Sequence, residues 1–211
     1  MAETRARGRE DKRRAILAAA FEVFGRRGYA DACVREVAEV AGVAKPTVYN
    51  HLTDKETLFR HAVDAVADQV LADGLAVVER LREPGDDLRA ALGDVVHRLV
   101  SACCDERSRT LRWLVRAQAV KFPDLVESVH GRTSGRLADA LADRLARLVL
   151  DGRLRRCEPG VAAEQLLALI TGPIEARSRA GTRVVPDEEA REVAENAVDT
   201  FLRAFGAARE G

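Results

Sequence analysis

The sequence has few of the features that mark secreted, membrane-spanning or disulfide-bonded proteins. Its four cysteines stand at irregular positions 33, 103, 104 and 157, so neither a disulfide framework nor a paired CxxC zinc site is visible. The longest run without a charged residue, residues 165–174, is far shorter than the roughly 18 apolar residues of a membrane span. The N-terminus lacks the apolar stretch of a secretory signal. We therefore expect a cytoplasmic protein with no membrane partner.

Aromatic residues and alternating apolar patterns are also scarce, whereas Ala, Leu, Arg and Glu are abundant. This composition argues against strands and predicts an all-α fold. An apolar fraction of 47% over 211 residues is ample for a buried core. Apolar periodicity and Gly or Pro breaks predict about nine helices, at about 9–27, 32–40, 45–52, 53–80, 88–99, 111–120, 137–148, 160–179 and 187–205.

The charge is balanced overall but uneven along the chain. Residues 1–60 carry 12 Lys and Arg against nine Asp and Glu, and the remaining residues carry 22 against 25. The basic excess at the N-terminus fits either an arm that meets phosphates or a solvated tail. We expect three parts: a basic flexible tail (1–8), a small N-terminal helical domain (9–55) and a larger helical domain (56–211).

Local signals place the ends of two of the early helices. Gly28 is suited to the left-handed conformation that ends a helix, and Tyr29 should then fold back on the first helix. Thr53 and Glu56 have the spacing of a capping box, which predicts that Thr53 caps the fourth helix.

The most specific spacing lies within residues 34–52. Ala38, Gly42 and Val48 stand where a helix-turn-helix needs a small residue, a turn glycine and an apolar contact. The alternative is a short helical hairpin without this function, because such hairpins also show this spacing by chance. The opposite face of the second helix carries groups suited to phosphates and base edges, namely Lys45, Thr47, Tyr49, Asn50 and His51.

Residues 14–59 resemble the DNA-binding domain of the TetR (tetracycline repressor-like) family of bacterial regulators. AILAAAFEVFGRRGY is similar to the first helix of that family, VREVAEVAGVAKPTVYNHL to its helix-turn-helix, and TDKETLF to the start of its fourth helix. Further along the chain, AQAVKFPDL and VDTFLRAF resemble segments of the regulatory domain.

The resemblance implies a homodimeric repressor that binds an inverted-repeat operator in double-stranded DNA and is released by a small-molecule effector. It makes residues 9–55 the helix-turn-helix DNA-binding domain and residues 56–211 the helical ligand-binding and dimerisation domain. Activation instead of repression, or regulation without an effector, stays open. The family often has Ser or Thr where Cys33 stands, and Ser where Ala44 stands, so two capping hydroxyls are missing here. Transferred position by position, the DNA contacts are expected at Arg35, Lys45, Pro46, Thr47, Tyr49, Asn50, His51 and Lys55.

The last helix carries an apolar stripe too wide for a single two-helix seam. Together with the preceding helix it predicts a four-helix dimer interface, as the resemblance also implies. The alternative is a core face within one chain. The expected interface residues are Leu166, Leu169, Ile170, Val193, Ala197, Val198, Phe201 and Phe205.

The resemblance also implies an effector pocket in the helical domain. Trp113 fits either a ligand platform or core packing, and Arg116 either an acidic effector or a solvated position. Gln118 stands where relatives often carry Glu, which argues against a cationic effector. The expected lining is Val66, Val70, His97, Cys104, Trp113, Arg116, Gln118 and Leu141.

Two other functions compete with this interpretation. His97, Cys103 and Cys104 suggest a metal- or redox-responsive regulator of the same fold, although no further ligand has a recognisable spacing. A helical enzyme or carrier would have to use His61, Asp64, His97 or His130, and no nucleophile motif or phosphate loop accompanies them. We therefore expect no catalytic residue, no metal site and no cofactor.

Overall fold

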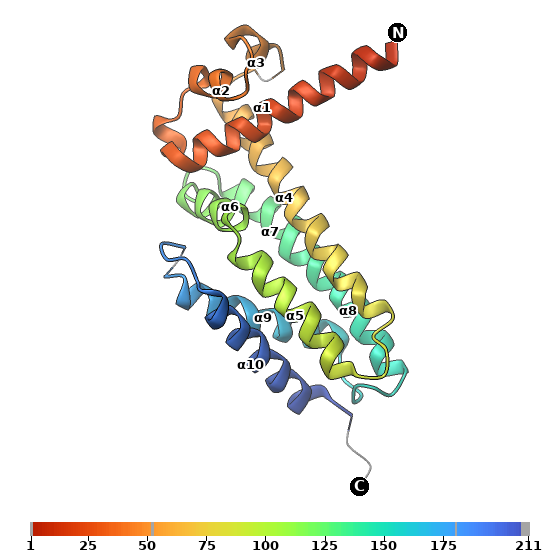
Figure 1. Cartoon of the computed structure of the whole chain (residues 1–211). Coiled ribbons are helices and arrows are strands. Elements are labelled where there is room, and N and C mark those ends of the chain that lie inside the picture. The colour runs from red at the N-terminus through yellow and green to blue at the C-terminus, as the bar shows by residue number, and fades with distance from the viewer. Residues whose placement is uncertain (1, 52, 180, 208–211) are drawn as a thin grey trace. The chain divides into compact units, whose positions relative to one another are not determined.

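The computed structural model describes residues 2–51, 53–179 and 181–207, with side chains for all of these except 2–7 and 51. Within the described residues the chain is helical, and its only β feature is one isolated bridge between Leu154 and Gly206. Figure 1 labels the helices. They are α1 (Ala2–Asp31), α2 (Val34–Val40), α3 (Lys45–His51), α4 (Lys55–Glu79), α5 (Leu88–Cys104), α6 (Glu106–Ala117), α7 (Pro123–His130), α8 (Arg136–Leu150), α9 (Pro159–Arg177) and α10 (Asp187–Phe205).

This arrangement confirms the all-α fold. A π-helical turn, Gly131–Gly135, joins α7 to α8. The described part of the chain thus has about nine helices, as predicted, when α7 and α8 are counted as one interrupted helix. Leu52, which was expected to end the third helix, lies outside the described residues.

The first helix is longer than the sequence predicts. The backbone of residues 2–8 is helical and continuous with α1, whereas we expect a flexible tail there, and the flexibility of this segment stays a prediction. Ala, Arg and Glu favour helices and the segment has no proline, so Gly8 is its weakest helix former. At the other end Gly28 interrupts the helix with φ 75°, as predicted, because glycine adopts this conformation without a Cβ clash.

The connection between α6 and α7 also differs from the prediction. The sequence predicts a helix over 111–120 and a break at residues 122–124, whereas α6 ends at Ala117 and α7 begins at Pro123. Hydrogen-bonded turns connect the two, with the amide of Phe122 donating to the carbonyl of Gln118. Proline lacks an N–H, which costs nothing at the first position of a helix. Pro123 therefore begins a helix that the sequence pattern does not predict.

A different residue from the predicted one caps α4. The carboxylate of Asp54 accepts a hydrogen bond from the backbone N–H of Thr57 at 2.8 Å, and a second from the Thr57 hydroxyl at 3.0 Å. Thr53 donates to the same carboxylate at 3.1 Å. The cap is therefore Asp54, because the backbone places its carboxylate and not the Thr53 hydroxyl at the first amides of the helix, and the predicted Thr53–Glu56 box is corrected.

The chain packs as two compact units. The first contains residues 1–69 and 110–129, and the second contains residues 70–109 and 130–211. This division by packing differs from the predicted boundary after residue 55, since α4 continues through both units. It also places most of α6 and nearly all of α7 with the N-terminal helices.

The first unit has an aromatic core where α1, α4 and the α6–α7 connection meet. Phe24 and Phe59 are almost fully buried and pack edge to face with ring centroids 5.0 Å apart. Tyr29 stacks on Phe24 at 6.0 Å, which confirms that it folds back on the first helix. Each such buried ring stabilises the fold by about 1.5–3 kcal/mol. The core thereby fixes the end of α1 against the start of α4.

In the second unit, α10 packs against α5 and α9, and α8 packs against α9. Figure 1 shows α9 and α10 side by side. The core is aliphatic except at its C-terminal end, where Phe201 and Phe205 pack 5.0 Å apart. Its centre is built from fully buried side chains, among them Leu92, Val96, Leu141, Leu145, Leu166 and Ile170.

Candidate nucleic-acid interface

The turn between α2 and α3 has the geometry that the sequence predicts. Gly42 adopts φ 64°, its N–H donates to the carbonyl of Glu39, and the N–H of Val43 donates to the carbonyl of Ala38. These two bonds form a Schellman motif, which satisfies carbonyls that the end of α2 leaves without helical partners. A side chain at Gly42 would be strained by the positive φ. The turn therefore sets a fixed angle between α2 and α3.

Small and branched apolar side chains hold the two short helices together. Val37, Ala38 and Val48 are 1–3% exposed. Ala38 has only a methyl group, so α2 and α3 can approach closely at this point. Because Val48 points into the core, neighbouring residues of α3 are turned toward solvent.

The outward face of α3 is polar. Lys45, Pro46 and Asn50 are exposed, Tyr49 is 43% exposed, and Thr47 is half-buried. The ammonium of Lys45 lies 5.8 Å from the centroid of the Tyr49 ring. The side chain of His51 lies outside the described residues. The structure thus brings the predicted contact residues of α3 onto one short helix whose opposite side is buried.

The two predicted phosphate contacts outside α3 differ in their surroundings. Arg35 on α2 is 76% exposed, and its Nε lies 3.8 Å from the Glu39 carboxylate. Lys55, the first residue of α4, is half-buried, and its ammonium donates to the carbonyl oxygen of Ala30 at 2.7 Å. Since an ammonium has three N–H donors, this bond does not exhaust its capacity. Lys55 therefore contributes to the fold and still presents a positive charge.

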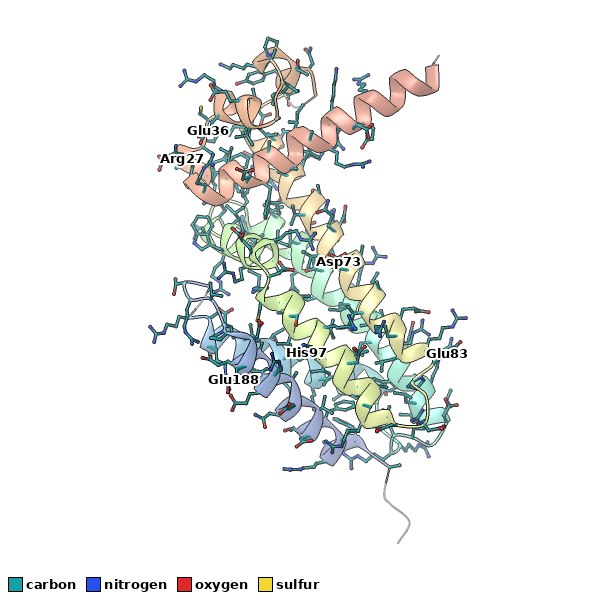
Figure 2. All side chains as sticks on the ribbon, in the orientation of Figure 1. Arg27, Glu36, Asp73, Glu83, His97 and Glu188 are labelled. Atoms are coloured by element: carbon teal, nitrogen blue, oxygen red, sulfur yellow. The ribbon has the colours of Figure 1, made fainter. Side chains whose placement is uncertain are left out.

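An ion pair fastens α2 to α1. Glu36 accepts hydrogen bonds from Arg26 at 2.8 Å and Arg27 at 3.3 Å. Figure 2 labels Arg27 and Glu36 at this contact. Desolvation raises the pKa of Glu36, but the hydrogen bonds from Arg27 and Arg26 outweigh it and hold the pKa below its ordinary value. Glu36 thus stays charged at neutral pH and helps to orient α2.

At Cys33 and Ala44, where the family often has a hydroxyl, the side chain does not cap the helix that follows. Cys33 occupies the N-cap position of α2, and its side chain makes no capping hydrogen bond. At α3, the carbonyl of Ala44 accepts from the amide of Thr47 at 2.8 Å, and the alanine side chain has nothing to donate or accept. Both short helices therefore depend on tertiary packing more than on their caps.

A cluster beside the predicted DNA-contact residues was absent from the predicted sites. Phe122 packs on Tyr29 at 5.2 Å and on Phe59 at 5.8 Å. Arg60 donates to both carboxylate oxygens of Asp124, at 2.7 and 3.3 Å. The sequence signal was the KFPDL segment, which we connected with a family resemblance but not with a contact to the first helix.

The predicted effector-pocket residues are divided between the two units. Val66, Trp113, Arg116 and Gln118 belong to the first unit, and Val70, His97, Cys104 and Leu141 to the second. Val66 and Leu141 are buried, and Val70, Cys104 and Gln118 are half-buried. His97, labelled on α5 in Figure 2, and Arg116 are exposed. The pocket stays a prediction.

Trp113 has a neighbour that the pocket prediction did not include. Its Cη2 atom lies 3.9 Å from the place where a Cβ on Gly28 would stand, and its side chain is 43% exposed. The only Trp of the chain thus lies against the end of α1.

The predicted dimer residues lie mostly inside one chain. Leu166, Ile170, Val193, Ala197, Val198, Phe201 and Phe205 are at most 8% exposed. The wide stripe on α10 is covered by α5 and α9 of the same chain, so its width does not require a second chain. Their burial within one chain fits the alternative of a core face, and the dimer interface stays a prediction. Leu169 is the half-buried exception.

The outer surface of the same two helices is hollowed. A cavity of about 410 Å³ opens between α9 and α10, lined by Leu169, Pro173, Phe201 and Phe205 together with four smaller or polar residues. On α9 the residues Ala168, Gly172 and Ala176, spaced four apart, are exposed. This surface is largely apolar and belongs to the second unit alone.

The residues named for the two competing functions are all at least partly exposed. Cys103 and Cys104 are half-buried, and His61, His97 and His130 are exposed. Among residues 2–51, 53–179 and 181–207, no three His, Cys, Asp or Glu side chains are grouped as a metal site would require. In the same ranges, no helix has the length and apolarity needed to cross a membrane.

Two family models match the chain. Residues 16–62 match the model for bacterial regulatory proteins of the tetR family. Residues 90–207, more than half of the chain, match the model described as the C-terminal domain of an AefR-like transcriptional repressor.

Individual proteins show the same similarity. A crystal structure described as a TetR-family transcriptional regulator from Mesorhizobium loti MAFF303099 superposes with a TM-score of 0.87 and 30% identity, covering 94% of this chain and 98% of its own. The uncharacterized HTH-type transcriptional regulator YezE of Bacillus subtilis (strain 168) is 27% identical over 150 residues, 70% of this chain and 75% of YezE. The HTH-type transcriptional activator FasR of Mycolicibacterium smegmatis is 33% identical over 84 residues, 40% of this chain and 38% of FasR.

Proposed function

Because this chain belongs to the TetR family of bacterial regulatory proteins, we propose that it is a repressor that binds a palindromic operator as a homodimer and leaves it when a small molecule binds. DNA binding and transcriptional regulation come with the family, and the matched relatives are regulators. The symmetry of the operator, the dimer, repression, the effector and action in the cytoplasm are the proposal. Repression is favoured because the model that matches residues 90–207 is named for a repressor.

The polar outer face of α3, backed by the buried Val48, is the observation that carries the proposal. A helix of this width fits a major groove, where each base pair presents a distinct set of donors and acceptors. In the proposed complex Lys45 and Thr47 reach base edges or nearby phosphates, while Tyr49 donates its hydroxyl to a phosphate. Pro46 lies in the first turn of the helix, and Asn50 and His51 contact base or backbone.

Arg35 and Lys55 are the proposed contacts to phosphates on either side of α3. Contacts of this kind set the position and orientation of a protein on a duplex, and they make binding strongly dependent on salt. They give little sequence information. In the proposed complex, α3 therefore determines which DNA sequence the protein prefers.

The proposed dimer places a second copy of this chain on the outer surface of α9 and α10. Ala168, Gly172 and Ala176 present small side chains there, which lets another helix approach closely. The apolar hollow beside Leu169 would be covered by the partner. Two α9 and two α10 helices then form a four-helix bundle, and the two α3 helices read half-sites about 34–36 Å apart.

The proposed effector acts through α4, which belongs to both units. A small molecule bound in the helical domain favours one tilt of α4, and that tilt changes the spacing of the two α3 helices. To clear the operator, the effector must bind the DNA-incompetent form more tightly by several kcal/mol, about 5.5 kcal/mol for a shift from 1:99 to 99:1.

Selection of bound duplexes from a random DNA pool at near-physiological salt tests the proposal. We expect an enriched inverted repeat, which the double variant Lys45→Ala, Tyr49→Ala fails to select. The variant Arg82→Ala, which removes an exposed charge in the second unit, serves as the charge control and should select the same repeat. No enriched sequence would contradict the proposal, and unchanged selection by the double variant would mean that α3 does not read DNA.

A further inference from the structure

Two lysines from distant parts of the sequence lie close to the ring of Tyr29. The ammonium of Lys55 is 5.1 Å from the ring centroid, and the ammonium of Lys121 is 4.2 Å from it. Lys55 begins α4, and Lys121 lies in the connection between α6 and α7. All three residues belong to the first unit. One aromatic ring therefore connects the α6–α7 connection with a proposed phosphate contact.

Two contacts at the end of α1 hold Lys55 in place. Its ammonium donates to the carbonyl oxygen of Ala30 at 2.7 Å and lies over the ring of Tyr29. Ala30 is in the last turn of α1, where carbonyls attract cations. The position of the Lys55 charge thus depends on where Tyr29 stands.

Residues 121–124 in turn hold Tyr29. Phe122, 3% exposed, packs edge to face on the Tyr29 ring at 5.2 Å, while Lys121 lies over it. The segment is fastened to α4 by Arg60, which donates two hydrogen bonds to Asp124 and stacks on Phe122 at 4.8 Å. If residues 121–124 move away, Tyr29 loses two neighbours and keeps Phe24 and Phe59, so its ring is held less tightly beside Lys55.

We propose that residues 121–124 position Lys55 for a backbone phosphate of DNA, acting through the ring of Tyr29. This inference rests on the proposed function and deepens it. Lys121, Phe122 and Asp124 are positioning residues, since none of them has to touch DNA. Through these contacts, a movement of the α6–α7 connection would change the position of Lys55 directly, in addition to any effect transmitted along α4.

The substitution Asp124→Asn tests the proposal because two explanations predict opposite signs. Asp124 is 68% exposed, so its loss should leave the fold intact. By charge alone, removing a negative group from a DNA-binding protein tightens binding. If Asp124 positions Lys55 through Phe122 and Tyr29, removing it weakens binding instead.

The measurement is the affinity for a labelled, mixed-sequence duplex at low salt, since a phosphate contact does not depend on sequence. We expect Asp124→Asn to bind about fivefold more weakly, within the range of coupling between residues of one network. Its plot of log affinity against log salt should also lose slope, because fewer counterions are released. In a Lys55→Met background the same substitution should have no such effect.

The control is Asp199→Asn, which also removes a carboxylate paired with an arginine, Arg89, but in the second unit. It should bind the duplex as tightly as the wild type or slightly more tightly. A second variant, Tyr29→Phe, keeps the ring and should retain wild-type affinity, whereas Tyr29→Leu should behave like Asp124→Asn. Thermal unfolding of each variant checks that the fold is retained.

Unchanged or tighter binding by Asp124→Asn overturns the inference and leaves the proposed function intact. An equal loss in the Lys55→Met background also overturns it, because Asp124 would then act on another contact. If the wild-type protein itself fails to bind duplex DNA, the proposed function and the inference both fall.

Discussion

Gly25 on α1 lies so close to Thr110 on α6 that a Cβ at Gly25 would be 2.7 Å from Cγ2 of Thr110. Real Cβ atoms do not approach other atoms this closely. Threonine is branched at Cβ and restricted at χ1, so its methyl group cannot easily swing aside. α1 and α6 therefore pack in the first unit at a point where a glycine is needed.

We expect Gly25→Ala to destabilise the protein by about 1–3 kcal/mol through overpacking, offset by at most about 1 kcal/mol of helix propensity. Thr110→Ser removes the clashing methyl and should rescue the variant. As a control, Gly93→Ala on α5 meets no atom within 4 Å and should stabilise by roughly 0.5–1 kcal/mol. Urea unfolding measures all of these, and equal effects at the two glycines would contradict the packing argument.

The cap of α4 predicts a pH dependence of stability. Hydrogen bonds from the backbone N–H and the hydroxyl of Thr57 lower the pKa of Asp54 below its ordinary value of 3.8. Because the folded pKa is the lower one, the stabilisation is complete above about pH 3.8 and is lost as the pH falls through the folded value.

Asp54→Ala should therefore lower the midpoint of thermal unfolding at pH 7, and the difference from the wild type should shrink as the pH falls below about 3.8. Thr53→Ala should have a much smaller effect, because its hydroxyl bonds only to Asp54 at 3.1 Å. If Thr53→Ala proved as costly as Asp54→Ala, the cap would be Thr53 after all.

Arg35 and Glu39 make a pair of variants with opposite expected effects on DNA binding. Their side chains are 76% and 69% exposed and 3.8 Å apart, so their ion pair is weak. Arg35→Gln should weaken binding and lower the salt slope by about one per subunit, as expected for a lost phosphate contact. Glu39→Gln should tighten binding, since it removes a carboxylate that competes for Arg35. Fluorescence anisotropy over a range of salt concentrations measures both, and equal affinities for the two variants would exclude Arg35 as a DNA contact.

If the protein is a dimer through α9 and α10, a substitution on that surface should lower its mass in solution. Ala168→Arg places a long charged side chain on the exposed face of α9 and should convert the dimer into a monomer, as measured by sedimentation equilibrium. Ala76→Arg, also at an exposed alanine but on α4, is the matched control and should leave the mass unchanged. A dimer that persists in Ala168→Arg would place the interface on another surface, and a monomeric wild-type protein would refute the dimer itself.

Local sequence signals were enough for most helices and for the turn at Gly42. Apolar periodicity and the backbone preferences of glycine and proline act over a few residues, so they can be read without the fold. The cap of α4 shows the limit even there. Thr53 and Asp54 are adjacent and both can cap a helix, and only the backbone geometry decides which of them does so.

The composition of the α3 face was also predictable, because the burial of Val48 turns its neighbours outward by helical geometry alone. The burial of the apolar stripe of α10 was predictable too, but the partner that covers it was not. Its pattern shows that the helix is covered on a wide face, but a core within one chain and an interface between two chains require the same residues. Only the packing of α5 and α9 against α10 separates the two cases.

By itself the sequence determined the all-α class, the order of the helices and the polar helix of the helix-turn-helix. The tertiary structure decided which distant residues meet: Gly25 with Thr110, Arg60 with Asp124, and Tyr29 with both Lys55 and Lys121. Helix periodicity tells which face of an element is buried but not against which partner. That choice depends on the simultaneous packing of many side chains, which no short stretch of sequence contains.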